Sequence, residues 1–168
     1  MNLLILKKAI LYSLILGIIF AFFGSFNSLI GLVALALGIF CAPCVIFFMK
    51  FRKEIGFLDN QQGAVLGVAS GFFATISFFL VFTPLTIMLS NLTPVISKKI
   101  KFIGSYHYSY GLPYLITPDS FWLFVVIVIA IAALVALTNS TTGMGATFIL
   151  AQIEKKPENI DEIDINIE

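Results

Sequence analysis

The sequence predicts an all-α membrane protein with four transmembrane helices, and three observations lead to this prediction. Hydrophobic residues make up 60% of the 168 residues and charged residues only 11%, whereas about a quarter of a soluble domain is charged. The apolar residues gather in four runs, each long enough to cross a membrane as a helix. The polar residues gather between these runs. We expect a compact up-down bundle with one longer loop between the third and fourth helices.

One transmembrane domain is expected over residues 1–153, with approximate spans at 3–23, 29–49, 63–90 and 121–151. Lys7 and Lys8 precede the first apolar run as in a signal peptide. However, the run continues past the usual short apolar core, and no cleavage site leads into a soluble domain. We therefore expect a retained first span, followed by a tight turn of small and polar residues (GSFNS).

The second span ends at the polar run Lys50–Glu54, and the third begins after a short polar connection. Asp59 or Asn60 is suited to cap the third helix, because short polar side chains bond to free backbone N–H groups there. Pro84 lies near the far end of that helix. A proline lacks a backbone N–H, so we expect Pro84 to kink or end the helix.

The longest connection covers residues 91–120 and contains two unusual stretches. Residues 95–103 mix apolar and basic side chains, as interfacial segments do. Residues 106–114 hold four tyrosines around His107, a composition typical of headgroup depth. The final residues, 154–168, are acidic with few residues that could pack, so we expect a mobile tail.

Charge distribution predicts the orientation. If both termini are cytoplasmic, seven basic residues lie inside: Lys7, Lys8, Lys50, Arg52, Lys53, Lys155 and Lys156. Three then lie outside: Lys98, Lys99 and Lys101. This excess of basic residues inside predicts a protein of the bacterial inner membrane with both termini cytoplasmic. The net charge of +1 gives no reason to expect a nucleic-acid partner. The expected partners are the bilayer and either further copies or a larger membrane complex.

The second, third and fourth spans contain no Asp, Glu, Lys, Arg or His. Proton relays, pumps and voltage sensors need ionisable groups at membrane depth, so their absence disfavours these functions. No catalytic residue, metal or cofactor is predicted. A structural zinc ion would need ligands beyond Cys41 and Cys44, and His107 lies on the opposite side in this topology.

Cys41 and Cys44 form a C-x-x-C pair expected to share one helix face, a spacing used by redox pairs. In this motif and in its four spans the chain resembles the quinone-linked thiol oxidases of bacterial membranes and the related vitamin K epoxide reductase type. The resemblance implies a membrane thiol–quinone oxidoreductase using both cysteines. Those enzymes relay electrons through a second cysteine pair, and this chain has only two cysteines. The favoured alternative is that both pack as small apolar residues in a helix bent by Pro43.

A dense polar run near the end of the fourth span consists of Thr138, Asn139, Ser140, Thr141 and Thr142. Hydroxyl and amide groups beside a helix break can coordinate a cation or line a polar path. The favoured alternative follows from length, because ~20 residues from Phe121 reach the membrane surface near Thr141. In that interpretation Asn139 or Ser140 caps a short amphipathic continuation.

Small residues recur every four positions on three spans. The repeats are Gly63, Gly67 and Gly71 on the third span, Ala34 and Gly38 on the second, and Ala132 and Ala136 on the fourth. Such stripes let helices approach closely in lipid. They indicate close packing within one bundle or, alternatively, an outward face that binds another subunit, for which the third span is the best candidate.

These patterns leave three functional hypotheses. The first is a non-enzymatic structural or accessory protein that packs through its small-residue faces. The second is an oligomeric channel or small-solute transporter, with Thr138–Thr142 or the glycine faces lining the path. The third is the thiol–quinone oxidoreductase. The sequence favours the first, because it accounts for the missing ionisable groups.

Overall fold

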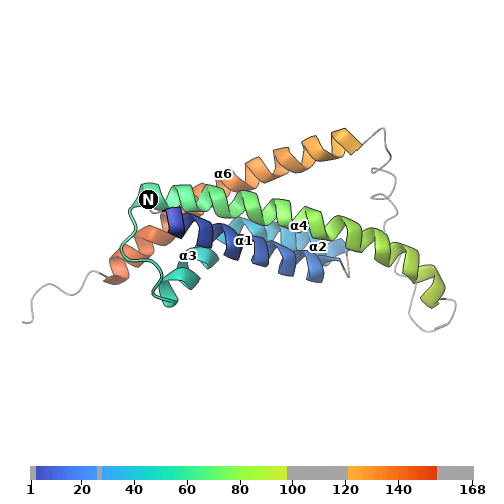
Figure 1. Ribbon diagram of the computed structural model, residues 1–168, viewed down its shortest axis with the longest axis horizontal. Helices are drawn as coiled ribbons and strands as arrows, with labels where there is room; N and C mark the ends of the chain where they lie inside the picture. The colour runs from blue at the N-terminus through green and yellow to red at the C-terminus, as the bar shows by residue number, and fades with distance from the viewer. Residues whose placement is uncertain (1–2, 26–27, 98–120, 155–168) are drawn as a thin grey trace, which may run out of the picture.

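The computed structural model describes residues 3–25, 28–97 and 121–154, and its long elements are all helices (Figure 1). They are α1 (Leu3–Gly24), α2 (Ser28–Leu37), a 3-10 turn η1 (Gly38–Phe40), α3 (Cys41–Phe51), α4 (Asn60–Ser97) and α6 (Phe121–Glu154). Within these residues, four segments are long and apolar enough to cross a membrane. The predicted all-α class and the four apolar helices of membrane-spanning length are therefore confirmed. The basic and tyrosine-rich loop residues 98–120, His107 among them, and the tail residues 155–168 lie outside the described residues.

The long helix α4 lies between α1 and α6 and contacts both of them extensively (Figure 1). In the second span, α2 packs mainly against α1. The other half, α3, packs against α4 and α6 and also contacts α1. In α6 the buried residues begin at Ala132. The Phe121 end of α6 stands away from the other helices in Figure 1. The tightest packing thus involves the second half of α6.

The second span is not the continuous helix predicted over residues 29–49. It is interrupted at Gly38–Phe40, where a 3-10 turn joins α2 to α3. Pro43, the third residue of α3, has no N–H to donate to the Ile39 carbonyl and would crowd it in a continuous helix. The prediction that Pro43 bends this helix correctly anticipated a disturbance here, but placed it within one continuous span.

Two other predicted helix ends are absent from the described residues. Pro84 does not end α4, which continues to Ser97 and so takes in the first residues of the predicted loop. The polar run at residues 138–142 does not interrupt α6 either. Asp59 does cap α4, as predicted: its carboxylate accepts a hydrogen bond from the Gln61 N–H at 2.7 Å.

The three glycines of α4 lie directly against the backbone of α6. A Cβ atom added to Gly63 would lie 2.8 Å from the Gly143 carbonyl oxygen. One added to Gly67 would collide with the Asn139 carbonyl, and one added to Gly71 would lie 2.8 Å from the Asn139 Cβ. This glycine stripe therefore faces the interior of the chain. The alternative arrangement, in which this stripe faces outward and binds another subunit, is therefore not found in the structure.

The other small residues of the predicted stripes differ among themselves. Ala34, Ala132 and Ala136 are buried. Gly38 has open space where a side chain would be, with nothing within 4 Å. It lies at the helix break rather than in a close helix contact.

We predict that Gly67→Ala destabilises the protein by about 1–3 kcal/mol, because the added methyl group must displace backbone atoms of α6. The matched control is Gly145→Ala in α6, where nothing lies within 4 Å of the added atom; alanine there should be neutral or slightly stabilising. Thermal unfolding of the detergent-solubilised protein measures both. Equal stability of the two variants would contradict the α4–α6 packing described above.

Candidate functional site

The break in the second span is bridged by one side chain from α6. In a continuous helix the Ala42 N–H would donate to the Gly38 carbonyl. Here the Asn139 amide lies between these two groups. Its Oδ1 accepts from the Ala42 N–H at 2.8 Å, and its Nδ2 donates to the Gly38 carbonyl oxygen at 2.8 Å. The amide thus replaces the missing backbone hydrogen bond with two of its own.

The remaining hydrogen of the Asn139 amide is also used. Nδ2 donates to the Val135 carbonyl of its own helix at 2.9 Å, so both donors and the acceptor have partners. Asn139 is 0% exposed. An amide buried this deeply is stable only when it is fully hydrogen-bonded.

Thr142 contributes to the same break one turn further along α6. Its hydroxyl lies 3.2 Å from the Ile39 carbonyl oxygen and 3.2 Å from the Asn139 carbonyl oxygen of its own helix, so its one hydrogen is shared between these two acceptors. The Ile39 carbonyl is the one that Pro43 leaves without a helical donor, because proline has no N–H. We name Asn139 and Thr142, together with the backbone of residues 38–42, the clasp.

The other members of the predicted polar run lie outside the clasp. The Thr138 and Thr141 hydroxyls are exposed and donate to carbonyls of α6 itself, those of Val135 and Thr138. Ser140 is half-buried. Helical periodicity separates the run, since residues 139 and 142 point towards the second span while 138 and 141 point away.

The interpretation favoured for this run was wrong on Asn139. It does not cap a short continuation of the fourth helix at the membrane surface, because α6 passes through it without interruption. A signal for its role was present in the sequence. Pro43 leaves backbone groups of the second span unpaired, and Asn139 is an amide in another apolar span that can bond to such groups.

The two cysteines occupy different environments. Cys41 is 0% exposed and Cys44 is exposed. The two thiols therefore do not have the common surroundings expected of a pair on one helix face. The Cys41 thiol faces the Ser70 carbonyl oxygen at 3.7 Å. The Ser70 hydroxyl is itself buried without a hydrogen-bond partner. Among the described residues, no three His, Cys, Asp or Glu side chains gather as a metal site would require.

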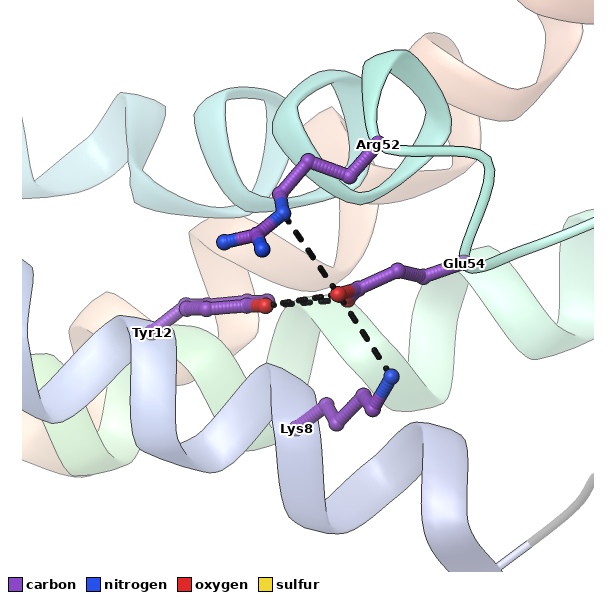
Figure 2. Close-up of polar contacts among 4 residues, drawn as sticks. All are labelled: Lys8, Tyr12, Arg52 and Glu54. Carbon is purple, nitrogen blue, oxygen red and sulfur yellow. Dashed lines mark hydrogen bonds and ion pairs between the residues drawn. The ribbon is translucent and has the colours of Figure 1, made fainter.

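A second polar cluster, missed by the sequence analysis, lies where α1 begins and α3 ends (Figure 2). The Glu54 carboxylate accepts from the Tyr12 hydroxyl at 2.9 Å. It also pairs with Lys8 Nζ at 3.4 Å and Arg52 Nε at 3.6 Å. We name these four residues the Glu54 cluster. The available signal was that Lys8 and Tyr12, four residues apart, share a helix face.

Comparison with protein-family models, with curated proteins and with solved structures finds no match to this chain. The functional interpretation therefore depends on the clasp, the Glu54 cluster and the packing of the helices.

We predict that Asn139→Leu lowers the free energy of unfolding by about 1–3 kcal/mol, because the buried Ala42 N–H loses the acceptor that Asn139 supplies. The Gly38 carbonyl keeps the hydrogen bond from the Cys41 N–H. Thr138→Val is the matched control. It removes a polar group one residue away that bonds only within α6, and we expect a change within about 0.5 kcal/mol. Chemical unfolding in detergent compares the two. A loss no larger for Asn139→Leu than for Thr138→Val would show that the clasp is not needed for stability.

Proposed function

We propose that this chain is a non-enzymatic structural or accessory protein of a membrane, built as an up-down bundle of four spanning helices. Figure 1 supports the bundle, since successive spans run in opposite directions along the long axis. The functional proposal depends on one observation. Within the described spans, most polar side chains donate hydrogen bonds to backbone carbonyls of the protein itself, as Ser13, Thr75 and Thr86 do.

These three bonds are made within single helices, to the carbonyl four residues earlier, and they leave the hydroxyls little capacity for a substrate. Ser70 and Thr83 have buried hydroxyls without a hydrogen-bond partner, and the Cys41 thiol next to Ser70 contacts its carbonyl oxygen. The two cysteines in their different environments give the thiol–quinone hypothesis no added support. It remains a prediction from the C-x-x-C spacing.

We propose the bacterial inner membrane as the location, with both termini in the cytoplasm. The support is the position of the basic residues. Those that the structure describes, Lys7, Lys8, Lys50, Arg52 and Lys53, all lie near the start of α1 and the end of α3. Basic residues at one end of a bundle favour the cytoplasmic side for that end.

An accessory role predicts a defined complex in the membrane. Gentle extraction of the tagged chain from its own membrane should give a native mass well above that of the 18.5 kDa chain, with the same additional chains in each preparation. Mass spectrometry identifies those chains. Recovery of the protein alone, as a monomer or as a pure homo-oligomer, would contradict the accessory role.

A second candidate function is a path for a small solute or monovalent cation, and the break in the second span favours it. Interrupted helices in transporters expose backbone carbonyls that bind substrates and ions near the middle of the membrane. Here the carbonyls of Gly38 and Ile39 meet the Asn139 amide and the Thr142 hydroxyl. These groups are uncharged, so they suit a weakly bound cation or a neutral solute better than a proton.

This candidate predicts K⁺ flux in liposomes containing the purified protein, and a several-fold change in that flux in Thr142→Val. Thr142 contacts the break, whereas Thr141 is exposed and bonds only to its own helix. Thr141→Val is therefore the matched control and should conduct like the parent. Absence of flux in the parent, or equal flux in all three proteins, would exclude a path at the clasp for this ion.

A further inference from the structure

The charged residues of the segment 3–97 lie near the start of α1, the end of α3 and the start of α4, and these three helix ends lie at one end of the molecule (Figure 1). Within residues 3–97, five are basic and two are acidic: Lys7, Lys8, Lys50, Arg52, Lys53, Glu54 and Asp59. Their formal sum is five minus two, or +3. Asp59 is engaged by the backbone it caps. This end therefore carries a local excess of positive charge where spanning helices meet the membrane surface.

Within the Glu54 cluster, the acid is buried more deeply than the bases around it. The side chain of Glu54 is 14% exposed, compared with 39% for Lys8 and 54% for Arg52. The carboxylate is thus covered by its three partners, while the cationic groups reach the surface. A ligand approaching from outside meets positive charge first.

Arg52 is held in a fixed orientation. Its Nε faces the Glu54 carboxylate, and its guanidinium lies over the Phe48 ring with Cζ 5.7 Å from the ring centroid. In Figure 2 the dashed line to the carboxylate starts at Nε, and none joins the two terminal nitrogens of Arg52 to the other residues drawn. A guanidinium held in this way presents two parallel N–H donors, the arrangement that binds phosphate bidentately.

The surroundings fit the headgroup region of a membrane. Lys53, next to Arg52, is exposed and has a positive φ of 56°. Phe51 and Phe57, which flank residues 52–54 in the sequence, are 87% and 71% exposed. Exposed aromatic side chains interleaved with basic ones are typical of segments that lie at the lipid–water boundary.

We propose that Arg52, Lys53 and Lys8 form a binding site for the phosphate group of an anionic phospholipid. Arg52 supplies the bidentate contact, and Lys8 and Lys53 add charge on either side. Glu54 and Tyr12 act as positioning residues: they hold Arg52 and Lys8 in place without contacting the lipid. Juxtamembrane basic clusters are attracted to anionic leaflets in general, and this cluster adds an orientation fixed by protein contacts.

The test is a titration of the full-length protein in detergent with phosphatidylglycerol, following the thermal unfolding temperature. We expect phosphatidylglycerol to raise this temperature in the parent, because a ligand that binds the folded state stabilises it. Phosphatidylcholine at the same concentrations should have much less effect. Arg52→Gln should weaken the apparent affinity for phosphatidylglycerol about tenfold or more, since it loses a charge-assisted bidentate contact.

Two further variants separate a built site from general charge attraction. Lys7→Gln removes the same charge at the same end, but Lys7 lies outside the Glu54 cluster, so near-parental affinity is expected. Arg52→Lys keeps the positive charge but loses the two parallel N–H donors, so an intermediate affinity is expected. If Arg52→Gln fails to fold, Arg52→Lys still tests the bidentate contact. Equal losses in Lys7→Gln and Arg52→Gln, or parental affinity in both Arg52 variants, would overturn the proposal.

A final titration distinguishes the phosphate group of a lipid from a free phosphate ion. Inorganic phosphate is titrated into the parent in the presence of phosphatidylcholine. A lipid site predicts little stabilisation by inorganic phosphate and a clear effect of phosphatidylglycerol. Stabilisation by inorganic phosphate with none by phosphatidylglycerol would overturn the lipid assignment and identify a soluble phosphate ligand.

Discussion

The hydrogen bonds between the Asn139 amide and the backbone of the second span are the interaction on which this structure most depends. In hydrocarbon no water is available to bond to an exposed N–H or carbonyl, so a helix can be interrupted there only if other groups replace its lost bonds. Pro43 forbids one such bond, and the turn at Gly38–Phe40 leaves a second unmade. Asn139 and Thr142 supply the partners from another helix. The interruption and its repair therefore have to occur together.

The glycines of α4 are a second part of the same arrangement. Gly67 and Gly71 have no side chains that would separate α4 from α6, so the Asn139 carbonyl lies against Gly67 and the Asn139 side chain lies against Gly71. Larger residues there would push α6 outward and separate the amide from Ala42. Close packing of α4 on α6 thus sets the position of the clasp, and the clasp in turn fixes α3 against α6. Three of the four spans are coupled through one buried amide.

The two polar clusters perform different physical tasks. The clasp is uncharged and turned inward, which suits a group that must remain in an apolar medium. The Glu54 cluster joins the start of α1 to the chain after α3 through ion pairs, and its basic groups are turned outward. Charge can be tolerated at that end because water and headgroups are close by. The clasp thus joins helices inside the bundle, and the Glu54 cluster presents basic groups at its surface.

The sequence by itself determined the all-α class and the four apolar helices long enough to cross a membrane, because hydropathy is a local property of consecutive residues. It limited the cap of α4 to Asp59 or Asn60, and the structure selected Asp59. The sequence also marked Pro43, Gly67 and Asn139 as unusual. It did not show that these residues belong to one arrangement, because the Asn139 amide bonds to residues about a hundred positions away. Pro84 lies in a helix that continues past it, whereas Pro43 lies just after a break, and nothing local distinguishes the two. Only the tertiary structure decided between them, since a helix interruption in an apolar medium persists where a neighbouring helix can supply the missing hydrogen bonds.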